Sequence, residues 1–579
     1  MDNNSAKRNL LDFAAMASSK KSSAEATQTV EQIARALEDF LAEHPKSVVA
    51  EDGKILFDMR SAKYQLATEH GRCTLQLWSE DRNLVRRVSA AIERGSARDR
   101  MLRLTVQRFG QARPSSLEIL ADRDRRTPST REATRLRYLK ALERVMLRAN
   151  ADDWGEWTSE GFRTAMDLEK SFGPAYARGS LVHGQQAWAV IAVNAEESQV
   201  TVDGILTLGV LWLAHCRESS GGRRLYCGLR LIVPRGMATL TLSRLAWMNT
   251  DAAQWELWEF DEKSEEMERR DAEDQGNLTT RLIHAPDEAA ARERFAESAA
   301  RVMDLVPEAM REVVEQRIRS GVEMAFLLHG LEFARVRMGY AGQSFNRVQE
   351  ITFGAGANET PLTEDNAGEL RELVARLFAR RTAGGASNGS GEAATAGADD
   401  EASAGSRPDR RDPLYRMQSE RWLESVLWRD VSLIDAHLDA THVYTQVPAF
   451  AAADRGMLDL LSVDKSGRLA VIELKVEEDL HLALQGLDYW VRVRWHHQQN
   501  PDQNSGLGEF QRNGYFGGVR LAEGAPRLYL VAPALRVHPA TEVVLRYLSP
   551  RVDWTLVAID ERWRRKMKVI WRKRSGQNL

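Results

Sequence analysis

The sequence contains few cysteines and no long apolar run, and these absences exclude several classes of protein. Cysteine occurs at three of the 579 positions, Cys73, Cys216 and Cys227, without metal-ligand spacing. A disulfide framework and a structural zinc site are therefore not expected. No apolar run reaches the roughly 18–20 residues that a membrane span needs. Residues 1–27 have no signal-peptide core and are expected to form a disordered leader. We expect a cytoplasmic protein that does not bind membranes.

Nucleotide-binding motifs are also missing. The sequence has no Walker A motif, helicase signature or dinucleotide fingerprint. ATP-driven unwinding within this chain is therefore not expected. A helicase or repair partner, if the protein works with one, would be a separate polypeptide.

Charge is segregated along the chain although the net charge is only −3. Between Arg82 and Arg148 there are 18 Lys and Arg residues against 7 Asp and Glu. Short alternating segments from Lys54 to Leu120 predict five or six antiparallel strands in a small barrel or sandwich. A basic β-rich module of this kind suits contact with a nucleic-acid backbone; a solvated sheet face is the alternative. The candidate contacts are Arg86, Arg87, Arg103 and Arg108.

The chain is too long for one hydrophobic core, so we predict an α/β multidomain protein. The apolar residues Phe295, Met303 and Val306, followed by Val322, Phe326 and Leu327, predict two packed helices. A Gly-, Ala- and Ser-rich stretch then predicts a flexible linker that lets the C-terminal domain move. The predicted parts are a leader at 1–27, a helix with the basic β-rich module at 28–150, an α/β domain at 151–275, a helical region at 276–380, a linker at 381–412 and a C-terminal domain at 413–579.

One stretch, from Gly456 to Tyr489, carries the residues that favour a catalytic function. It predicts a strand over Leu458–Val463, a turn over Asp464–Gly467, a second strand over Arg468–Lys475 and a helix from about Asp479. Side chains alternate along a strand, so Ala470, Ile472 and Leu474 share one face, while Leu469, Val471, Glu473 and Lys475 share the other.

Asp459 and Glu473 are expected on adjacent strands, where two carboxylates make an oxygen site of the kind that Mg²⁺ prefers. Lys475 lies on the face of Glu473, where it can orient water or contact a phosphoryl oxygen. On the following helix, Gln485 and Tyr489 are four residues apart and can lean over one site. A surface salt bridge between Glu473 and Lys475 is the alternative interpretation.

This set of residues resembles the PD-(D/E)xK nuclease superfamily, and within it the RecB-like branch. The resemblance rests on Asp459, Glu473-Leu474-Lys475 and Gln485-x-x-x-Tyr489, and it covers about residues 413–560. The preceding helix at Ser419–Ile434 resembles the opening helix of NucS (EndoMS)-type nuclease domains, which implies a further acid at Glu424, with Glu420 as second choice. Leu458 stands where the superfamily has its usual proline.

The resemblance implies a restriction-endonuclease-like αβββαβ core and a metal-dependent DNA endonuclease acting in repair or defence. Asp459, Glu473 and Glu424 would then bind Mg²⁺ or Mn²⁺. Lys475 would position or deprotonate water, and Gln485 and Tyr489 would hold the substrate. Single-stranded, branched or mismatched DNA is the implied substrate, and a homodimer is left open.

Residues 155–262 show a second, degenerate version of the same pattern. Ala187–Ser198 matches Arg468–Asp479 in its apolar core, and both are followed by a helix and by strands ending in Val/Ala-Pro and Asp-Glu. This alignment sets Ala192 against Glu473 and Asn194 against Lys475. We therefore predict an inactive nuclease-like copy, with the general repetitiveness of buried α/β cores as the alternative.

Two segments beyond the motif are also candidates for substrate contact. The loop at His496–Pro526, with Phe510, Tyr515 and Phe516, covers the substrate or is a disordered insertion. The tail from Arg562 to Arg574 interleaves basic and aromatic residues, which suits nucleic acid; a final strand with one solvated face is the alternative. The tail candidates are Arg564, Arg565 and Lys568.

Three functions remain open from the sequence. The acid set favours a DNA endonuclease. A non-catalytic nucleic-acid-binding or assembly protein that retains a nuclease fold is the second hypothesis. An RNA-processing nuclease is the third, since nothing in the sequence distinguishes a 2′-hydroxyl.

Overall fold

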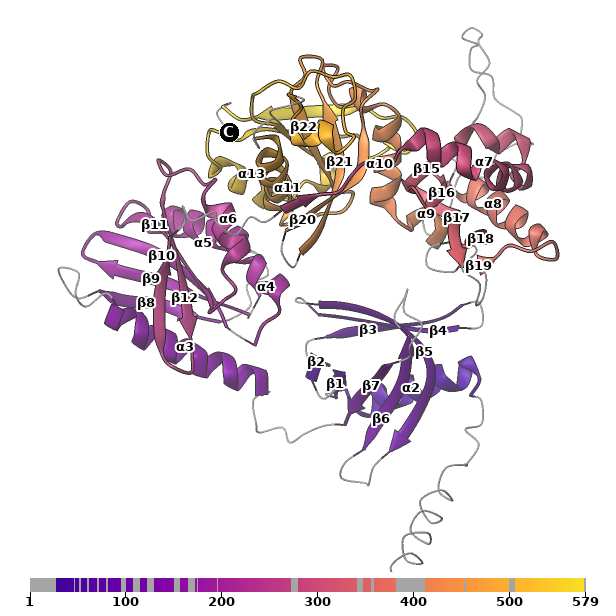
Figure 1. Ribbon diagram of the computed structural model, residues 1–579. Coiled ribbons are helices and arrows are strands. Elements are labelled where there is room, and N and C mark those ends of the chain that lie inside the picture. The colour runs from indigo at the N-terminus through magenta and orange to yellow at the C-terminus, as the bar shows by residue number, and fades with distance from the viewer. Residues whose placement is uncertain are drawn as a thin grey trace, which may run out of the picture. The chain divides into compact units, whose positions relative to one another are not determined.

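The computed structural model shows a mixed α/β protein that separates into two compact units (Figure 1). The first unit ends at Ala133, and the second runs from Thr134 to Leu579. The predicted leader at 1–27 and nearly all of the predicted linker lie outside the described residues. The structure describes residues 28–576 except for 46, 52–53, 60–61, 70–71, 80–81, 95–99, 108–114, 122–129, 150–156, 165–171, 174, 195, 272–279, 341–346, 356–358, 382–411, 452–453 and 499–505.

The first unit is a seven-stranded antiparallel sheet with one helix packed on it. Helix α2 (Val30–Glu43) begins after Thr29, whose hydroxyl accepts a hydrogen bond from the backbone N–H of Gln32, and it buries Leu37 and Phe40 against the sheet. The predicted strands are confirmed. The sheet has edges at β2 and β3 among the described residues, so it is one open sheet rather than a barrel or sandwich. In spatial order its strands are β2 (Lys54–Asp58), β1 (Val48–Glu51), β7 (Ser115–Leu120), β6 (Met101–Gln107), β5 (Arg82–Arg94), β4 (Arg72–Ser79) and β3 (Lys63–Glu69).

The first α/β segment, residues 134–270, is a six-stranded sheet with helices on both faces. Helix α3 (Thr130–Ala149) covers one face, and α5 (Ile205–Ser220) with α6 (Thr239–Leu245) covers the other. Alternation along β10 explains this, because Ala189 and Ile191 pack with α5 whereas Trp188 and Val190 pack with α3. In spatial order the strands are β13 (Glu266–Arg270), β12 (Gln254–Asp261), β11 (Leu225–Pro234), β10 (Gln186–Val193), β9 (Tyr176–His183) and β8 (Thr158–Arg163).

The second α/β segment, residues 413–576, forms a seven-stranded sheet that also takes in a strand from outside the segment. Strand β14 (Thr280–Leu282) pairs antiparallel with β20, so the predicted boundary at 413 omits part of this sheet. Helix α10 (Ser419–Arg429) lies on one face, and α11 (Leu482–His497) with α13 (Pro539–Arg546) on the other (Figure 1). After β14 the order is β20 (Tyr444–Ala451), β21 (Asp454–Val463), β22 (Leu469–Leu474), β23 (Arg527–Pro533), β24 (Asp553–Ile559) and β25 (Val569–Arg574).

The two α/β segments have the same topology. β9 and β10 pair antiparallel, β10, β11 and β12 run parallel, and β13 closes antiparallel; β21 to β25 repeat each of these relationships in order. In both segments the connection from the second strand of this series to the third contains a long helix (α5 or α11), and the connection from the third to the fourth contains another helix (α6 or α13). The predicted repetition of the strand and helix order is confirmed.

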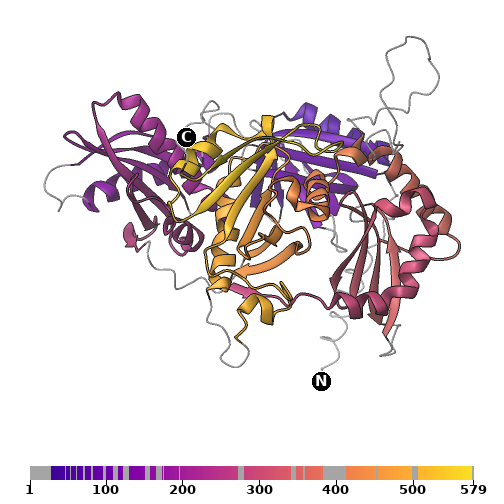
Figure 2. The ribbon, with the colours of Figure 1, turned by 90° about the horizontal axis from the view of Figure 1, so that it is seen from above.

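Residues 288–381, here called the β-domain, lie almost wholly in the region 276–380 that was predicted to be helical, and this prediction is wrong for their central part. Helices α7 (Glu288–Leu305) and α8 (Ala367–Arg381) are present, and they pack on one antiparallel sheet (Figure 2). The predicted helix around Phe326 and Leu327 is strand β16, where five consecutive residues are buried. A short, continuous apolar run fits a buried strand as well as a buried helix. The strands in order are β15 (Val314–Ser320), β16 (Glu323–Leu328), β17 (Leu331–Tyr340), β18 (Arg347–Phe353) and β19 (Thr360–Pro361).

Both ends of the predicted linker are held against the same unit. Arg381 donates hydrogen bonds from Nη1 to the carbonyl oxygens of Leu414 (2.6 Å) and Met417 (2.8 Å). Arg380 and Asp412 form an ion pair at 3.1 Å. The residues that flank the predicted linker thus lie in direct contact, which the sequence did not predict, because composition says nothing about the distance between the ends of a segment.

The described part of the loop between α11 and β23, residues 506–526, packs its aromatic side chains into the core. Phe510, Tyr515 and Phe516 are buried. The Tyr515 hydroxyl donates to the carbonyl oxygen of Ile283 (2.9 Å), and the backbone N–H of Phe516 donates to the hydroxyl of Tyr444 (2.7 Å). The described part of the loop thus fastens β14 and β20 to the rest of the second α/β segment.

One helical stretch among the described residues, Gln199–Ser220, is long and apolar enough to cross a membrane. Most of it is buried between the two α/β segments. This burial is typical of a core helix in a soluble protein.

Candidate active site

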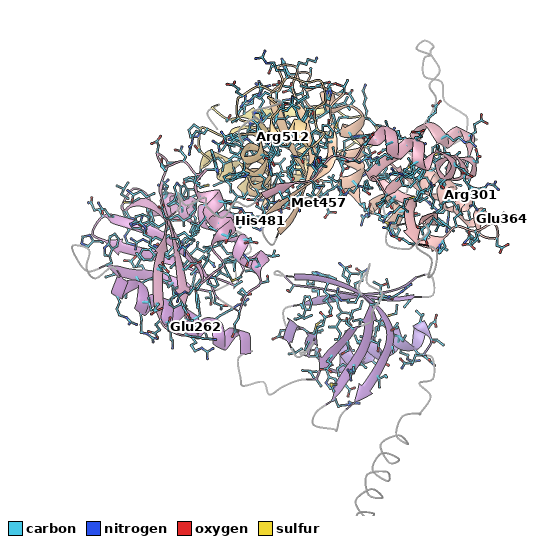
Figure 3. All side chains as sticks on the ribbon, in the orientation of Figure 1. Glu262, Arg301, Glu364, Met457, His481 and Arg512 are labelled. Atoms are coloured by element: carbon cyan, nitrogen blue, oxygen red, sulfur yellow. The ribbon has the colours of Figure 1, made fainter. Side chains whose placement is uncertain are left out.

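Asp459 and Glu473, here called the acid pair, lie on adjacent strands. The register pairs Leu460 of β21 with Ile472 of β22, so Asp459 falls opposite Glu473. The backbone N–H of Leu474 donates a hydrogen bond to Oδ2 of Asp459 at 2.9 Å. Met457, two residues before Asp459, marks this part of β21 in Figure 3. The predicted hairpin, with a turn at Asp464–Gly467, is confirmed.

Burial makes ionisation of the acid pair unfavourable. Desolvation raises the pKa of Asp459 to about 6, against the hydrogen bond from Leu474, which lowers it. Desolvation and then the nearby Asp459 carboxylate raise the pKa of Glu473 well above its usual range. Oε2 of Glu473 is buried without a hydrogen-bond partner among the described residues. Buried carboxylates in this state attract a cation.

Lys475 supplies one positive charge beside the acid pair. Its Nζ lies 3.2 Å from Oε1 of Glu473 and 3.9 Å from Oε1 of Glu420. Burial lowers the pKa of Lys475, but the carboxylates of Glu473, Glu420 and Asp459 outweigh burial, and the net direction is upward. Lys475 is therefore held in its charged form, which suits orienting water or contacting an anion and does not suit accepting a proton.

Helix α11 brings Tyr489 near the acid pair, whose charges act on its hydroxyl, and carries Gln485 one turn earlier. Between them Gly486 faces β23, where an added Cβ would lie 2.4 Å from Cδ2 of Leu530 and 3.7 Å from Cβ of Glu473. Oε1 of the neighbouring Gln485 is buried without a hydrogen-bond partner among the described residues. Burial, then the charges of Glu473 and Asp459, raise the pKa of Tyr489, so its hydroxyl stays protonated and can donate a hydrogen bond.

Glu424, predicted as a metal ligand, is instead held by arginines. Its carboxylate pairs with Arg317 of β15 at 2.7 Å and with Arg421 at 2.5 Å. Glu424 is buried, and its charge still contributes to the raised pKa of Asp459. Of the two helix acids, Glu420 is the one that lies beside Lys475.

Gln446 is a residue of this region that sequence reasoning missed. The pairing of β20 with β21 skips it between Thr445 and Val447, so it stands opposite Asp459. Its backbone φ is 53°, a left-handed conformation that is unfavourable for residues other than Gly, Asn or Asp. Its side-chain amide donates to Oε2 of Glu424 at 3.1 Å and accepts from Nη1 of Arg319 at 3.3 Å. Nothing in a β-strand pattern signals this backbone conformation.

The fit of a divalent metal can be judged from the acid pair. Among the described residues, no three His, Cys, Asp or Glu side chains converge into a metal-binding group. Two carboxylates are nevertheless enough for Mg²⁺, which usually keeps several waters and binds one or two carboxylates plus substrate phosphates. The unpartnered Oε2 of Glu473 gives such an ion an available oxygen. Asp459 and Glu473 therefore fit Mg²⁺ or Mn²⁺, whereas Glu424 is occupied by its arginines.

The first α/β segment carries different residues at every equivalent position. Leu231 pairs with Ile191 and Leu530 with Glu473, so the structure corrects the sequence alignment by one residue. The error matters because a shift by one moves a side chain to the other face of a sheet. The equivalents of Asp459, Glu473, Lys475, Gln485 and Tyr489 are Arg178, Ile191, Val193, Leu208 and Trp212. Arg178 is buried and lies over the rings of Phe172 and Trp212.

The basic residues predicted to bind nucleic acid do not form one surface. Arg86 lies on the buried face of β5, 3.7 Å from Glu51, while Arg87 points to the opposite face. Arg103 is exposed on β6, and Arg108 lies outside the described residues.

In the tail, the side chain of Arg564 packs against aromatic rings. It stacks on Trp563, Tyr415 and Trp422, and it donates to the hydroxyl of Ser419. Arg565 and Lys568 are exposed, and β25 is a final strand with alternating burial.

No protein-family model matches this chain, and no curated protein matches it either. The case for a function therefore rests on the acid pair and the residues around it.

Proposed function

We propose that the protein is a metal-dependent endonuclease that hydrolyses DNA phosphodiester bonds at the acid pair. The observation that carries the proposal is the burial of Asp459 and Glu473 on adjacent strands, with both pKa values raised and Lys475 beside them. Burying two carboxylates side by side lowers the stability of a folded protein unless a cation compensates their charge. Carboxylates with raised pKa values are therefore typical of functional sites.

Each residue then has a role that its environment supports. Asp459 and Glu473 would hold Mg²⁺ or Mn²⁺, which when bound polarises the phosphate and stabilises developing negative charge. Lys475, kept charged by its carboxylate neighbours, orients the attacking water or contacts a phosphate oxygen. Tyr489 donates a hydrogen bond from its protonated hydroxyl, and Gln485 offers its amide. The water oxygen bonds to phosphorus, the bond to one sugar oxygen breaks, and that oxygen takes a proton.

The test is cleavage of labelled single-stranded, flapped, mismatched and matched duplex DNA, with a matched RNA, in Mg²⁺, Mn²⁺ or EDTA. We expect metal-dependent cleavage of one or more DNA substrates, lost in Glu473→Gln and retained in Glu477→Gln, which alters an exposed carboxylate just beyond β22. Cleavage of RNA alone would favour an RNA-processing nuclease.

Metal binding provides a second readout that does not depend on activity. Calorimetric titration with Mn²⁺ in the absence of DNA should show binding to the wild type and to Glu477→Gln, and none to Glu473→Gln. DNA binding without Mn²⁺ binding and without cleavage would contradict the proposal. The engagement of Glu424 by Arg317 and Arg421 would then favour the second candidate, a non-catalytic nucleic-acid-binding protein.

A further inference from the structure

The two α/β segments meet through equivalent parts of their folds. The residue that follows α6 by three positions, Met248, forms an antiparallel bridge with Leu548, which follows α13 by two. The backbone N–H of Asn249 donates to the carbonyl oxygen of Tyr547, and that of Ser549 donates to the carbonyl oxygen of Trp247, both at 2.8 Å. The contact therefore joins two equivalent loops, one from each segment, to each other.

The helices around this bridge also make reciprocal contacts between the two segments. Helix α5 of the first segment contacts α13 of the second, and α11 of the second contacts α6 of the first. Arg217 and Arg494 each lie eight residues after the glycine that packs α5 or α11 on its sheet. Arg494 lies over the ring of Trp247 at 4.4 Å, and Arg217 lies over the ring of Tyr547 at 5.8 Å.

Reciprocal contacts of this kind identify an approximate two-fold axis. In a two-fold dimer of identical subunits, residue i of one contacts residue j of the other, and j contacts i. Here the two partners are segments of one chain, and they share one hydrophobic core. The first α/β segment thus occupies the place that an identical partner would take beside the second.

The two positions related by this axis are chemically unlike. One holds Asp459, Glu473 and Lys475. The other holds Arg178, Ile191 and Val193, none of which can ligate a metal as a carboxylate does. The pair of segments therefore carries one acid pair where a symmetric dimer would carry two.

We propose that each chain cuts only one strand of a DNA duplex and releases a nick rather than a double-strand break. This inference rests on the proposed nuclease function. The backbones of a duplex are related by two-fold axes, so a symmetric pair of sites meets both strands while a single site meets one. One water is consumed and one phosphodiester bond is broken for each binding event.

The experiment uses the full-length chain in excess over a negatively supercoiled plasmid, with the metal that supports cleavage of oligonucleotides. We expect the open-circular form to accumulate fully before linear DNA appears, and linear DNA to follow with a lag at two enzyme concentrations. Glu473→Gln should leave the plasmid supercoiled, and Glu477→Gln should behave as the wild type.

A duplex oligonucleotide of the preferred type, with a different fluorophore on each strand, provides the second measurement. On a denaturing gel, only one of the two labelled strands of each cut molecule should be shortened. On a native gel, the fragments should stay together as a duplex. Linear plasmid formed without a lag, or both strands cut in concert, would overturn the inference and leave the nuclease function standing. Absence of cleavage in every metal would contradict the nuclease function itself.

Discussion

At the scale of single residues, the acid pair should reduce the stability of the metal-free protein. The pKa of Glu473 is raised on folding, so the folded state holds a proton that the unfolded state releases, and stability falls as the pH rises through the raised pKa. Glu473→Gln removes this cost. We expect it to increase the free energy of unfolding at pH 8.5 in EDTA, measured by urea denaturation.

The exposed Glu477 offers the matched control, because Glu477→Gln should change the stability little. The gain for Glu473→Gln should shrink as the pH falls toward 4.5, the ordinary pKa of a glutamate, where the unfolded carboxyl is already half protonated. A loss of stability in Glu473→Gln at pH 8.5 would show that the buried Glu473 carboxylate does not destabilise the metal-free fold.

His329 should make the stability depend on pH in the opposite sense. Desolvation, then the charges of Arg429 and Arg381, lower its pKa to about 4, and its ring stacks on Trp422 at 5.1 Å. The unfolded state binds the proton more tightly, so stability present above pH 6.5 is lost as the pH falls toward 4, by on the order of 3 kcal/mol. His329→Asn should flatten this slope in urea denaturation at a series of pH values.

Asparagine suits this test because His329 has a φ of 48°, a conformation that asparagine tolerates. His437, which is exposed, provides the control. An unchanged slope in His329→Asn would show that the acid sensitivity comes from other groups.

The sequence predicts part of the candidate site for a physical reason. Asp459, Glu473 and Lys475 are brought together by a hairpin and by the alternation of side chains along a strand. Both features can be predicted from neighbouring residues in the sequence. The ion pair of Glu424 was not predicted because its partner Arg317 lies 107 residues away on another sheet. Local patterns contain no information on such a pairing.

At the scale of elements, the packing of α11 on its sheet should control the site. An alanine at position 486 would place its Cβ 2.4 Å from a leucine methyl on β23 and force the helix outward. We expect Gly486→Ala to cost about 1–3 kcal/mol of stability and to reduce cleavage, since Gln485 and Tyr489 move with the helix. Thermal unfolding and the oligonucleotide assay measure the two effects.

Gly368 in α8 is the matched control, because an added Cβ there meets nothing within 4 Å. Gly368→Ala should stabilise slightly through helix propensity. Equal behaviour of the two variants would contradict the close approach of α11.

The contact between β15 of the β-domain and α10 depends on a buried cation. Arg317 bonds Glu315 and Glu424 at 2.6 and 2.7 Å and lies over the ring of Trp428. Arg317→Met leaves two buried carboxylates with less compensation, which should cost about 3–5 kcal/mol in urea denaturation. Arg301→Met on the exposed side of α7, labelled in Figure 3, should be close to neutral.

The type of an element was readable from the sequence where its periodicity was long, as in α2 and α3. It was not readable at Glu323–Leu328, where five consecutive buried residues give no period at all. The buried loop residue Phe516 was missed for a related reason, since it is buried by contact with β20 and not by any regular pattern.

At the scale of the whole molecule, the stretch at 382–411 should be dispensable for the fold. Its flanking residues already meet, through Arg381 with Leu414 and Arg380 with Asp412. Replacing 382–411 with about six Gly and Ser residues should leave the thermal unfolding midpoint unchanged or slightly raised, because shortening a loop lowers its closure entropy. A clear fall in the midpoint would show that the stretch contributes contacts of its own.

The repeat of strand and helix order was visible in the sequence because both segments keep the same apolar runs. Its two-fold arrangement was not visible, because it depends on which surfaces meet. The bridge between Met248 and Leu548 joins positions 300 residues apart that share no motif.

The shared core has a consequence for any fragment of this chain. Leu487, Trp490 and Val491 of α11 are buried in a cluster that includes residues of the first α/β segment. A fragment that begins at residue 413 would lose the part of this cluster that the first segment supplies, including Trp247, whose ring lies 4.8 Å from that of Trp490, and would also lack β14. Such a fragment could bury this apolar surface again by pairing with a second copy of itself through the face that the first α/β segment covers in the full chain. The length of a recombinant fragment would thus decide whether an assembly contains one acid pair or two.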